Sequence, residues 1–293
     1  MHRSIVALFA ATASAAVHGL QPGEAPACLA TAALAAVPEL PEASGLAVSR
    51  RTPGRLWAHN DSGEPILFAL DARGAVTARL RLGGARVEDW EAVAAGPCPA
   101  GSCLYVGDIG DNDAERHRIT VYRIPEPAGS ERPTDALGVF HATYPDGAHD
   151  AEALLVTPDG DLLIVTKGST GPVALYGFPR ELRTGETHAL RRVGQPRGRE
   201  PDEDERVTDG AVSPDGRWVA LRTRTSVALH RAADLSAGNW SEVRRIDLKA
   251  VGEPQGEGVA IGPDGSLYLA GEGGGQGRPG TLARLACTGL GPG

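Results

Sequence analysis

Aromatic residues and lysines are scarce in this chain of 293 residues. Phe, Trp and Tyr make up 4% of the sequence, whereas glycine and proline are abundant, at 39 and 22 residues. This composition favours many short elements joined by turns over long helices. The net charge is -8, and no basic cluster marks a nucleic-acid-binding surface, so we expect no nucleic-acid partner.

Long hydrophobic runs are also missing, except at the N-terminus. Arg3 precedes an apolar run over residues 5–17, with Ala13-Ser14-Ala15 as a cleavage site, which predicts a signal peptide over residues 1–16. The run is too short to span a bilayer comfortably, and no later segment is long enough, so we expect no transmembrane span. The protein is therefore predicted to be secreted, periplasmic or extracellular. A lipoprotein attached through Cys28 is the weaker alternative, because a proline lies next to that site.

No CxxC pair occurs among the four cysteines, which disfavours a zinc ribbon or a thioredoxin-like site. Four cysteines in an exported protein predict two disulfides. Cys98 and Cys103 flank the turn PCPAGSC and are expected to form a local bridge. Cys28 and Cys287 then pair by elimination and join the first ordered segment to the last.

An internal repeat is the most informative feature that is present. Five segments start with acidic or polar residues and continue with a small residue and an apolar run: EASGLAVS, DWEAVAAG, DAEALLVT, TDGAVS and QGEGVAIG. A turn follows each segment, and three of these turns contain Pro-Asp-Gly, a hairpin signal. Two further apolar strands come next, and a more polar fourth strand follows in all repeats but the last.

Five repeats of four strands, spaced by about 45 to 60 residues, predict an all-β fold, a five-bladed β-propeller. Six blades remain possible if one lies in a long connection such as 125–136 or 179–206. The last repeat lacks its fourth strand, and residues 29–37 are expected to supply it and close the ring. The predicted Cys28–Cys287 disulfide would lie at that seam. Residues 28–288 are thus predicted to form a single domain.

Polar residues gather at two positions of each repeat. Because the strands of a blade are antiparallel, the start of the innermost strand and the end of the second strand lie at one end of the blade. One face of the ring should therefore collect polar side chains around the central channel. The predicted ligand-binding residues are Asn60, Asp61, Asp89, Glu91, Asp150, Glu152, Lys167, Arg222 and Glu257. The same reasoning places Ser44, Thr208, Asp209, Arg224 and Glu272 on this face.

The segment LYVGDIGDN, from Leu104 to Asn112, is an apolar strand that runs into an oxygen-rich turn. Asp108, Asp111 and Asn112 either cap that turn or hold a hard cation, and calcium is the predicted cofactor. The alternative for the whole face is structural: polar residues satisfy backbone groups, line a wet channel and neutralise one another. His59 and His149 are expected on the same face, more as hydrogen-bonding residues than as metal ligands.

Several motifs resemble a family of secreted, largely uncharacterised bacterial β-propeller proteins: HNDSG, DWEAVA, LYVGDIGDN, YPDGAHDAEALLV and SPDGRWVALRT. The resemblance covers most of residues 42–272 and implies a fold and an export route, but no established activity. DAEALLV and QGEGVAI also resemble, more distantly, alkaline phytase-like propellers, which use calcium and carboxylates to hydrolyse phosphate esters. Those enzymes have six blades and further acidic and lysine motifs without a match here, so no residue roles are carried over.

Two functions follow from these observations. The first is a binding module whose acidic face takes a small anionic ligand, or an envelope protein or glycan. The alternative is a calcium-dependent phosphoesterase, in which Asp108 and Asp111 hold the metal while Lys167 and Arg222 stabilise the developing charge. Whether the protein is an enzyme is left open, and a monomer is expected.

Overall fold

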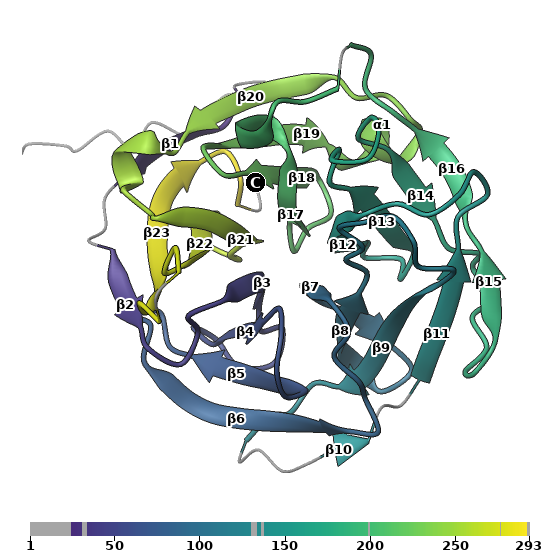
Figure 1. Ribbon diagram of the computed structural model, residues 1–293. Helices are drawn as coiled ribbons and strands as arrows, with labels where there is room; N and C mark the ends of the chain where they lie inside the picture. Colours follow the sequence, from purple (N-terminus) through teal and green to yellow (C-terminus); the bar gives the residue numbers. More distant parts are fainter. Residues whose placement is uncertain are drawn as a thin grey trace, which may run out of the picture.

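Five β-sheets form a ring around a common axis, the arrangement of a five-bladed β-propeller (Figure 1). The computed structural model describes residues 25–30, 34–129, 134–135, 138–198, 200–275 and 277–291. The predicted signal peptide lies outside these ranges. None of the helices in the described part of the chain is long and apolar enough to cross a membrane.

The first two blades each gain an extra outer strand. Blade 1 consists of β3 (Ala43–Val48), β4 (Leu56–Asn60), β5 (Ile66–Leu70) and β6 (Val76–Gly83), with β10 (Thr134–Asp135) parallel to β6. Blade 2 consists of β7 (Trp90–Cys98), β8 (Gly101–Asp108), β9 (Ile119–Pro125) and β11 (Gly138–Thr143), with β15 (Thr187–Ala189) parallel to β11.

Blades 3 and 4 are antiparallel sheets of four strands each. Blade 3 contains β12 (Ala151–Val156), β13 (Leu162–Thr166), β14 (Leu175–Gly177) and β16 (Arg191–Gly194). Blade 4 contains β17 (Val207–Val212), β18 (Trp218–Thr223), β19 (Ser226–Arg231) and β20 (Glu242–Asp247). In the described part of the chain, three short helices lie in connections: η1 (Glu203–Glu205), α1 (Ala232–Ser236) and η2 (Lys249–Val251). The connections considered for a sixth blade instead supply β10, β15, β16 and η1.

The N-terminus closes the ring, as the sequence predicts. Blade 5 combines β21 (Gln255–Ile261), β22 (Leu267–Glu272) and β23 (Gly280–Thr288) with β1 (Ala27–Ala30) and β2 (Ala35–Val37). The expected closing strand is thus two short strands, and both pair antiparallel with β23. Cys28 lies opposite Cys287 in this pairing, and the two form a disulfide. Cys98 and Cys103 form the second disulfide, so both predicted bridges are confirmed.

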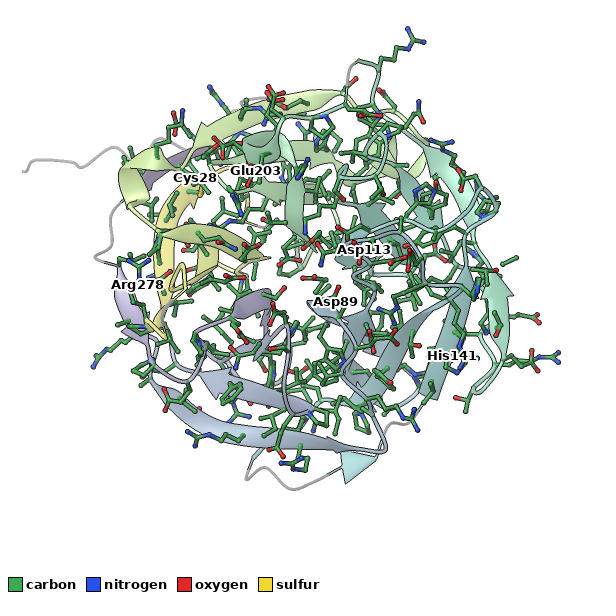
Figure 2. The ribbon with its side chains drawn as sticks, in the orientation of Figure 1. Cys28, Asp89, Asp113, His141, Glu203 and Arg278 are labelled. Carbon is green, nitrogen blue, oxygen red and sulfur yellow. A yellow bond between two sulfur atoms is a disulfide. The ribbon has the colours of Figure 1, made fainter. Side chains whose placement is uncertain are left out.

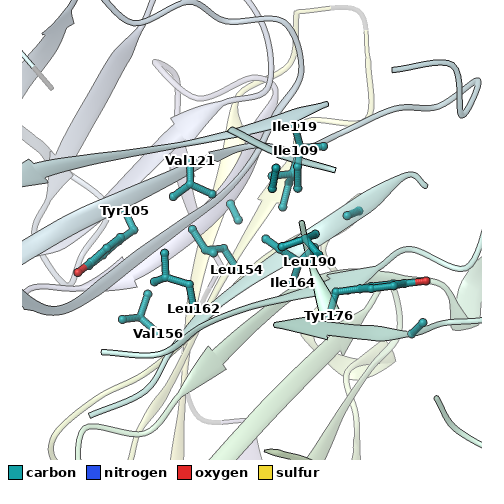
Figure 3. Packing of buried hydrophobic residues seen from close by; sticks show 14 of the residues in the cluster. Tyr105, Ile109, Ile119, Val121, Leu154, Val156, Leu162, Ile164, Tyr176 and Leu190 are labelled. Atoms are coloured by element: carbon teal, nitrogen blue, oxygen red, sulfur yellow. The ribbon is translucent and has the colours of Figure 1, made fainter. Parts of the chain in front are cut away.

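The hydrophobic core lies between neighbouring blades. In β7, Ala92 packs in the cluster shared with blade 3, whereas Val93 packs in the cluster shared with blade 1. Figure 3 shows the first of these clusters, in which Tyr105 and Ile119 of blade 2 meet Leu154 of blade 3. Successive side chains of a strand point to opposite faces, so one innermost strand seals two interfaces. This packing holds the five strands around the axis in place.

Candidate functional site: an acidic ring at the channel mouth

Every innermost strand contains a β-bulge near its start. The pairing register shifts between Trp90 and Ala92 in β7 and between Ala151 and Ala153 in β12, and equivalent shifts occur in β3, β17 and β21. A bulge leaves a residue unpaired and re-aims its side chain. The polar residues at the five bulges are Ser44, Glu91, Glu152, Thr208 and Glu257. We call these five residues the acidic ring.

The acidic ring connects neighbouring blades. Ser44 Oγ lies 2.9 Å from both the carbonyl oxygen and Oε2 of Glu91. Thr208 Oγ1 donates to the carbonyl oxygen of Glu257 at 2.9 Å. All five side chains are almost completely buried, with exposed fractions from 2% to 7%. Carboxylates in such a position keep their charge only if a cation or hydrogen-bond donors compensate for the lost water.

Lys167 is the cation in contact with the acidic ring. Its Nζ forms an ion pair with Glu152 Oε1 and lies 3.5 Å from Asp150 Oδ2. Burial lowers the pKa of Lys167, but the charges of Glu152 and Asp150 raise it more, and the net pKa is higher than usual. Burial raises the pKa of Glu152 to about 8, against the opposing charge of Lys167. One lysine therefore does not neutralise the ring.

The other two glutamates of the ring are also shifted toward their neutral forms. Burial, then the charges of Glu152 and Asp89, raise the pKa of Glu91 well above its usual range. Burial raises the pKa of Glu257, although Gln255 donates a hydrogen bond to its Oε1 at 2.8 Å. One oxygen of each carboxylate, Glu91 Oε1 and Glu257 Oε2, has no hydrogen-bond partner among the described residues.

Further carboxylates surround the ring on the same face. Asp89 lies near the centre of the ring of blades in Figure 2. Burial and the charge of Asp150 raise its pKa, with Arg116 and Lys167 opposing. Burial also raises the pKa of Asp61 to about 6 and that of Glu272 to about 7, and neighbouring carboxylates add to both shifts. The predicted acidic face is therefore a group of mutually repelling carboxyls with few compensating charges.

The turn after β8 holds its own carboxylates in structural contacts. Asp108 Oδ1 accepts from the backbone N–H of Asp89 at 3.1 Å and lies 2.9 Å from Arg116 NH1. The two carboxylate oxygens of Asp111 accept from the backbone N–H groups of Glu115 and Arg116, both at 2.9 Å. A cation at Asp108 and Asp111 would have to displace these donors. Asn112 is exposed, and its Nδ2 lies 3.4 Å from Asp89 Oδ2.

No group of three or more His, Cys, Asp or Glu in the described ranges has a geometry that could hold a metal ion. Calcium at Asp108, Asp111 and Asn112 thus stays a prediction from the sequence. The arrangement of donors fits it poorly, because Arg116 already occupies the position of a counter-ion beside Asp108.

Three other predicted ligand residues also serve the fold. Asn60 bridges the backbone N–H of Glu42 and the carbonyl of Glu39. Asp150 accepts from the backbone N–H of Asp111 at 2.9 Å and from Ser169 Oγ at 3.0 Å. Arg222 is fully buried, where its guanidinium pairs with Glu253 and donates to the carbonyls of Gly258 and Ala270. A ligand from solvent does not reach Arg222 in this structure, which corrects its assignment to the binding face.

Two residues outside the predicted ligand set shape the channel. Asp209 is fully buried and accepts from the backbone N–H groups of Gly210, Val259 and Leu46, on three different blades. Burial raises its pKa well above the usual range, while these three donors oppose the rise.

Gly110 is the second residue that shapes the channel: a Cβ added there would contact Asp89 Oδ2 and lie 2.8 Å from Glu91 Oε1. The glycine in LYVGDIGDN is the sequence signal for this close approach.

The two histidines lie in different surroundings. His59 is fully buried, and burial lowers its pKa to about 4, so it is a neutral core residue. His149 Nε2 lies 3.1 Å from Asp146 Oδ1 and 3.0 Å from Tyr176 Oη, in a cluster on blade 3. Neither histidine belongs to the acidic ring.

No family model matches the chain, and a comparison with curated proteins finds no match. Among solved structures, a gluconolactonase from Xanthomonas campestris is similar over 83% of this chain and 72% of its own, at 16% identity and a TM-score of 0.44. A streptogramin B lyase is similar over 86% of this chain and 97% of its own, at 12% identity and a TM-score of 0.43. A PQQ-bound aldose sugar dehydrogenase from Streptomyces coelicolor is similar over 91% of this chain and 99% of its own, at 12% identity and a TM-score of 0.49.

At these levels the comparisons carry no functional argument. The sheet topology and the acidic ring by themselves define the class of protein: a five-bladed β-propeller with a carboxylate-rich channel mouth.

Proposed function

We propose that the acidic ring binds a small cationic ligand. The observation that carries this proposal is the pair of unpartnered carboxylate oxygens, on Glu91 and Glu257, in side chains that are 7% exposed. Their pKa values are raised because burial and neighbouring carboxylates disfavour the charge. A bound cation removes both penalties at once, since it offers the oxygens a partner and neutralises their repulsion.

Three cationic side chains of this face are already paired, so an anionic ligand finds no free partner among them. Lys167 pairs with Glu152, Arg116 with Asp108 and Arg224 with Glu203. The small anionic ligand expected from the sequence is therefore not the one that this arrangement favours. Because the described residues contain no cluster with the geometry of a metal site, an organic ammonium group fits the acidic ring better than a divalent metal, and a titration with both kinds of cation separates them.

Proton release distinguishes this site from ordinary surface binding. Because the glutamates are held toward their neutral forms, a cation must displace protons to bind. Affinity should then rise with pH between about 5 and 8, the region in which Glu272 and Glu152 titrate, with pKa values of about 7 and 8. Calorimetry in two buffers with different ionisation enthalpies measures the number of protons released.

The test is a titration of the mature protein with Ca²⁺, Mg²⁺, Mn²⁺, choline and spermidine. We expect Glu91→Gln to weaken binding of the preferred cation by about tenfold to a hundredfold, the loss that follows from removing a charged partner. Glu64→Gln is the matched control, because Glu64 is an exposed acid paired with Arg81, outside the acidic ring. No binding of any of these cations at millimolar concentration, or an equal loss in both variants, refutes the proposal.

Calcium-dependent hydrolysis of phosphate esters is the second candidate. The observation that favours it is Lys167, a cation among carboxylates, which would have to leave Glu152 and Asp150 to meet a phosphate held by a metal. Release of phosphate from p-nitrophenyl phosphate, measured with calcium and with chelator, tests this activity directly. Turnover that requires calcium and is lost in Lys167→Met supports it, whereas turnover unaffected by either change rejects it.

We further propose that the protein works outside the cytoplasm, a location that its two disulfides support.

A further inference from the structure

The opposite half of the channel is apolar. Beyond the acidic ring, the innermost strands of all five blades line a cavity of about 340 Å³. The apolar residues that line it include Val48, Ala95, Val156, Val212 and Ile261, one from each blade. A cavity of this size falls in the range of small-molecule sites, and most of its lining is apolar. The space is therefore suited to an apolar group.

The cavity opens at the face of the β3–β4 and Pro-Asp-Gly turns, away from the acidic ring. Pro53, Pro214 and Pro263, which belong to these turns, line its rim. Arg50 and Arg51 are the charged side chains in the lining of the cavity, and both are exposed. The rim thus carries positive charge in a protein with a net charge of -8. The acids of two neighbouring turns are engaged elsewhere: Asp215 pairs with Arg217, and Asp264 with Arg284.

Buried contacts fix the turn that carries the two arginines. Glu126, which is 1% exposed, accepts from Ser49 Oγ at 2.5 Å and from the backbone N–H of Arg50 at 3.1 Å. Arg51 NH1 donates to the carbonyl of Glu126 at 3.2 Å. The Arg50 guanidinium has no hydrogen bond or ion pair with any described residue. A pre-organised turn with one uncommitted guanidinium lowers the entropic cost of holding an anion.

We propose that this cavity binds an amphipathic anion, with its apolar tail in the channel and its anionic head at Arg50 and Arg51. The chemistry is that of a soluble molecule with a carboxylate, sulfate or phosphate on a hydrocarbon chain. The tail contacts the apolar ends of the innermost strands, while the head remains at the rim in contact with water. This site is separate from the acidic ring and takes a ligand of the opposite charge.

The tail is tested with a homologous series of straight-chain alkanoates, from butanoate to decanoate, titrated as monomers. Affinity should rise about fourfold for each added methylene, the value for burying one CH₂ group, and then level off when the cavity is full. Ala211→Phe places a large side chain in the cavity wall and should abolish the dependence on chain length. Affinities that do not change along the series overturn the proposal, and they do so whether or not Ala211→Phe folds.

The head is tested by charge reversal at the rim. Arg50→Glu should weaken octanoate binding by roughly fivefold or more and leave octanol binding unchanged. Arg73→Glu is the matched control, because Arg73 is an exposed arginine in the β5–β6 turn, at the same end of the blade but away from the cavity. Equal losses in the two variants overturn the proposal. So does binding that occurs only on phosphatidylcholine vesicles containing phosphatidylglycerol, which would indicate a membrane surface as the partner.

Discussion

Removal of the disulfide at the seam should cost far more stability than removal of the local disulfide. Cys28 and Cys287 are 259 residues apart, whereas Cys98 and Cys103 are 5 apart. In the chain-entropy model, a cross-link lowers the entropy of the unfolded chain, and this loss grows with the logarithm of the number of residues in the loop that it closes. That relation gives about 5 to 6 kcal/mol for the seam disulfide and about 2 kcal/mol for the local one. The difference arises from loop length and does not depend on the contacts of either bridge.

The assay compares Cys28→Ser/Cys287→Ser with Cys98→Ser/Cys103→Ser by equilibrium unfolding in guanidinium chloride. The free energy of unfolding of the seam variant should be lower than that of the local variant by about 3 kcal/mol, with similar m-values. Hydrogen exchange adds a spatial check, since β1 has lost the covalent link of Cys28 to β23 and should exchange faster than β2. Equal losses in the two variants would refute the chain-entropy argument, and a larger loss in the local variant would point to strand packing instead.

Three further predictions concern the channel. The stability of the ligand-free protein should fall as the pH rises from about 5 to 8, because native carboxyls such as Glu272, with a pKa of about 7, hold protons that the unfolded chain releases; a flat melting temperature over this range would contradict this. Gly110→Ala should displace the carboxylates of Asp89 and Glu91 and weaken cation binding, measured by calorimetry, while circular dichroism shows an intact fold. Unchanged affinity would show that the loop moves to make room for the methyl group and leaves the carboxylates in place. Asp209→Ala should lower the free energy of unfolding by about 3 kcal/mol, because three buried N–H groups lose their acceptor, and a loss below about 1 kcal/mol would rule out that role.

The repeat made the fold predictable because it is local in the sequence. Each blade has its own run of short strands and turns, so the five-fold pattern and the incomplete last repeat are visible without any knowledge of long-range contacts. The pairing of Cys28 with Cys287 followed from elimination, and the register of β1 on β23 confirms it. Within the range expected for one strand, 29–37, the described residues belong to β1 and β2.

The partners of the charged side chains could not be predicted in the same way. Arg116 reaches Asp108 because the turn after β8 folds back, and Arg222 pairs with Glu253 from the connection into the next blade. Such contacts depend on how neighbouring blades pack, which the spacing of residues within one repeat does not encode. Arg222 was therefore placed at the channel mouth by its position in the repeat, although its side chain is buried against β21 and β22.

The bulges explain why one strand position becomes acidic and the next positions apolar. In a regular strand, side chains alternate between two faces, and an extra residue reverses the alternation. Glu91 and Glu152 occupy the inserted position, so the apolar residues on either side of them still pack into the interfaces between blades. The carboxylates are thereby excluded from the core without breaking its pattern. This separation leaves an acidic ring at one end of the channel and a largely apolar cavity at the other, so the two ligands proposed for them differ in charge.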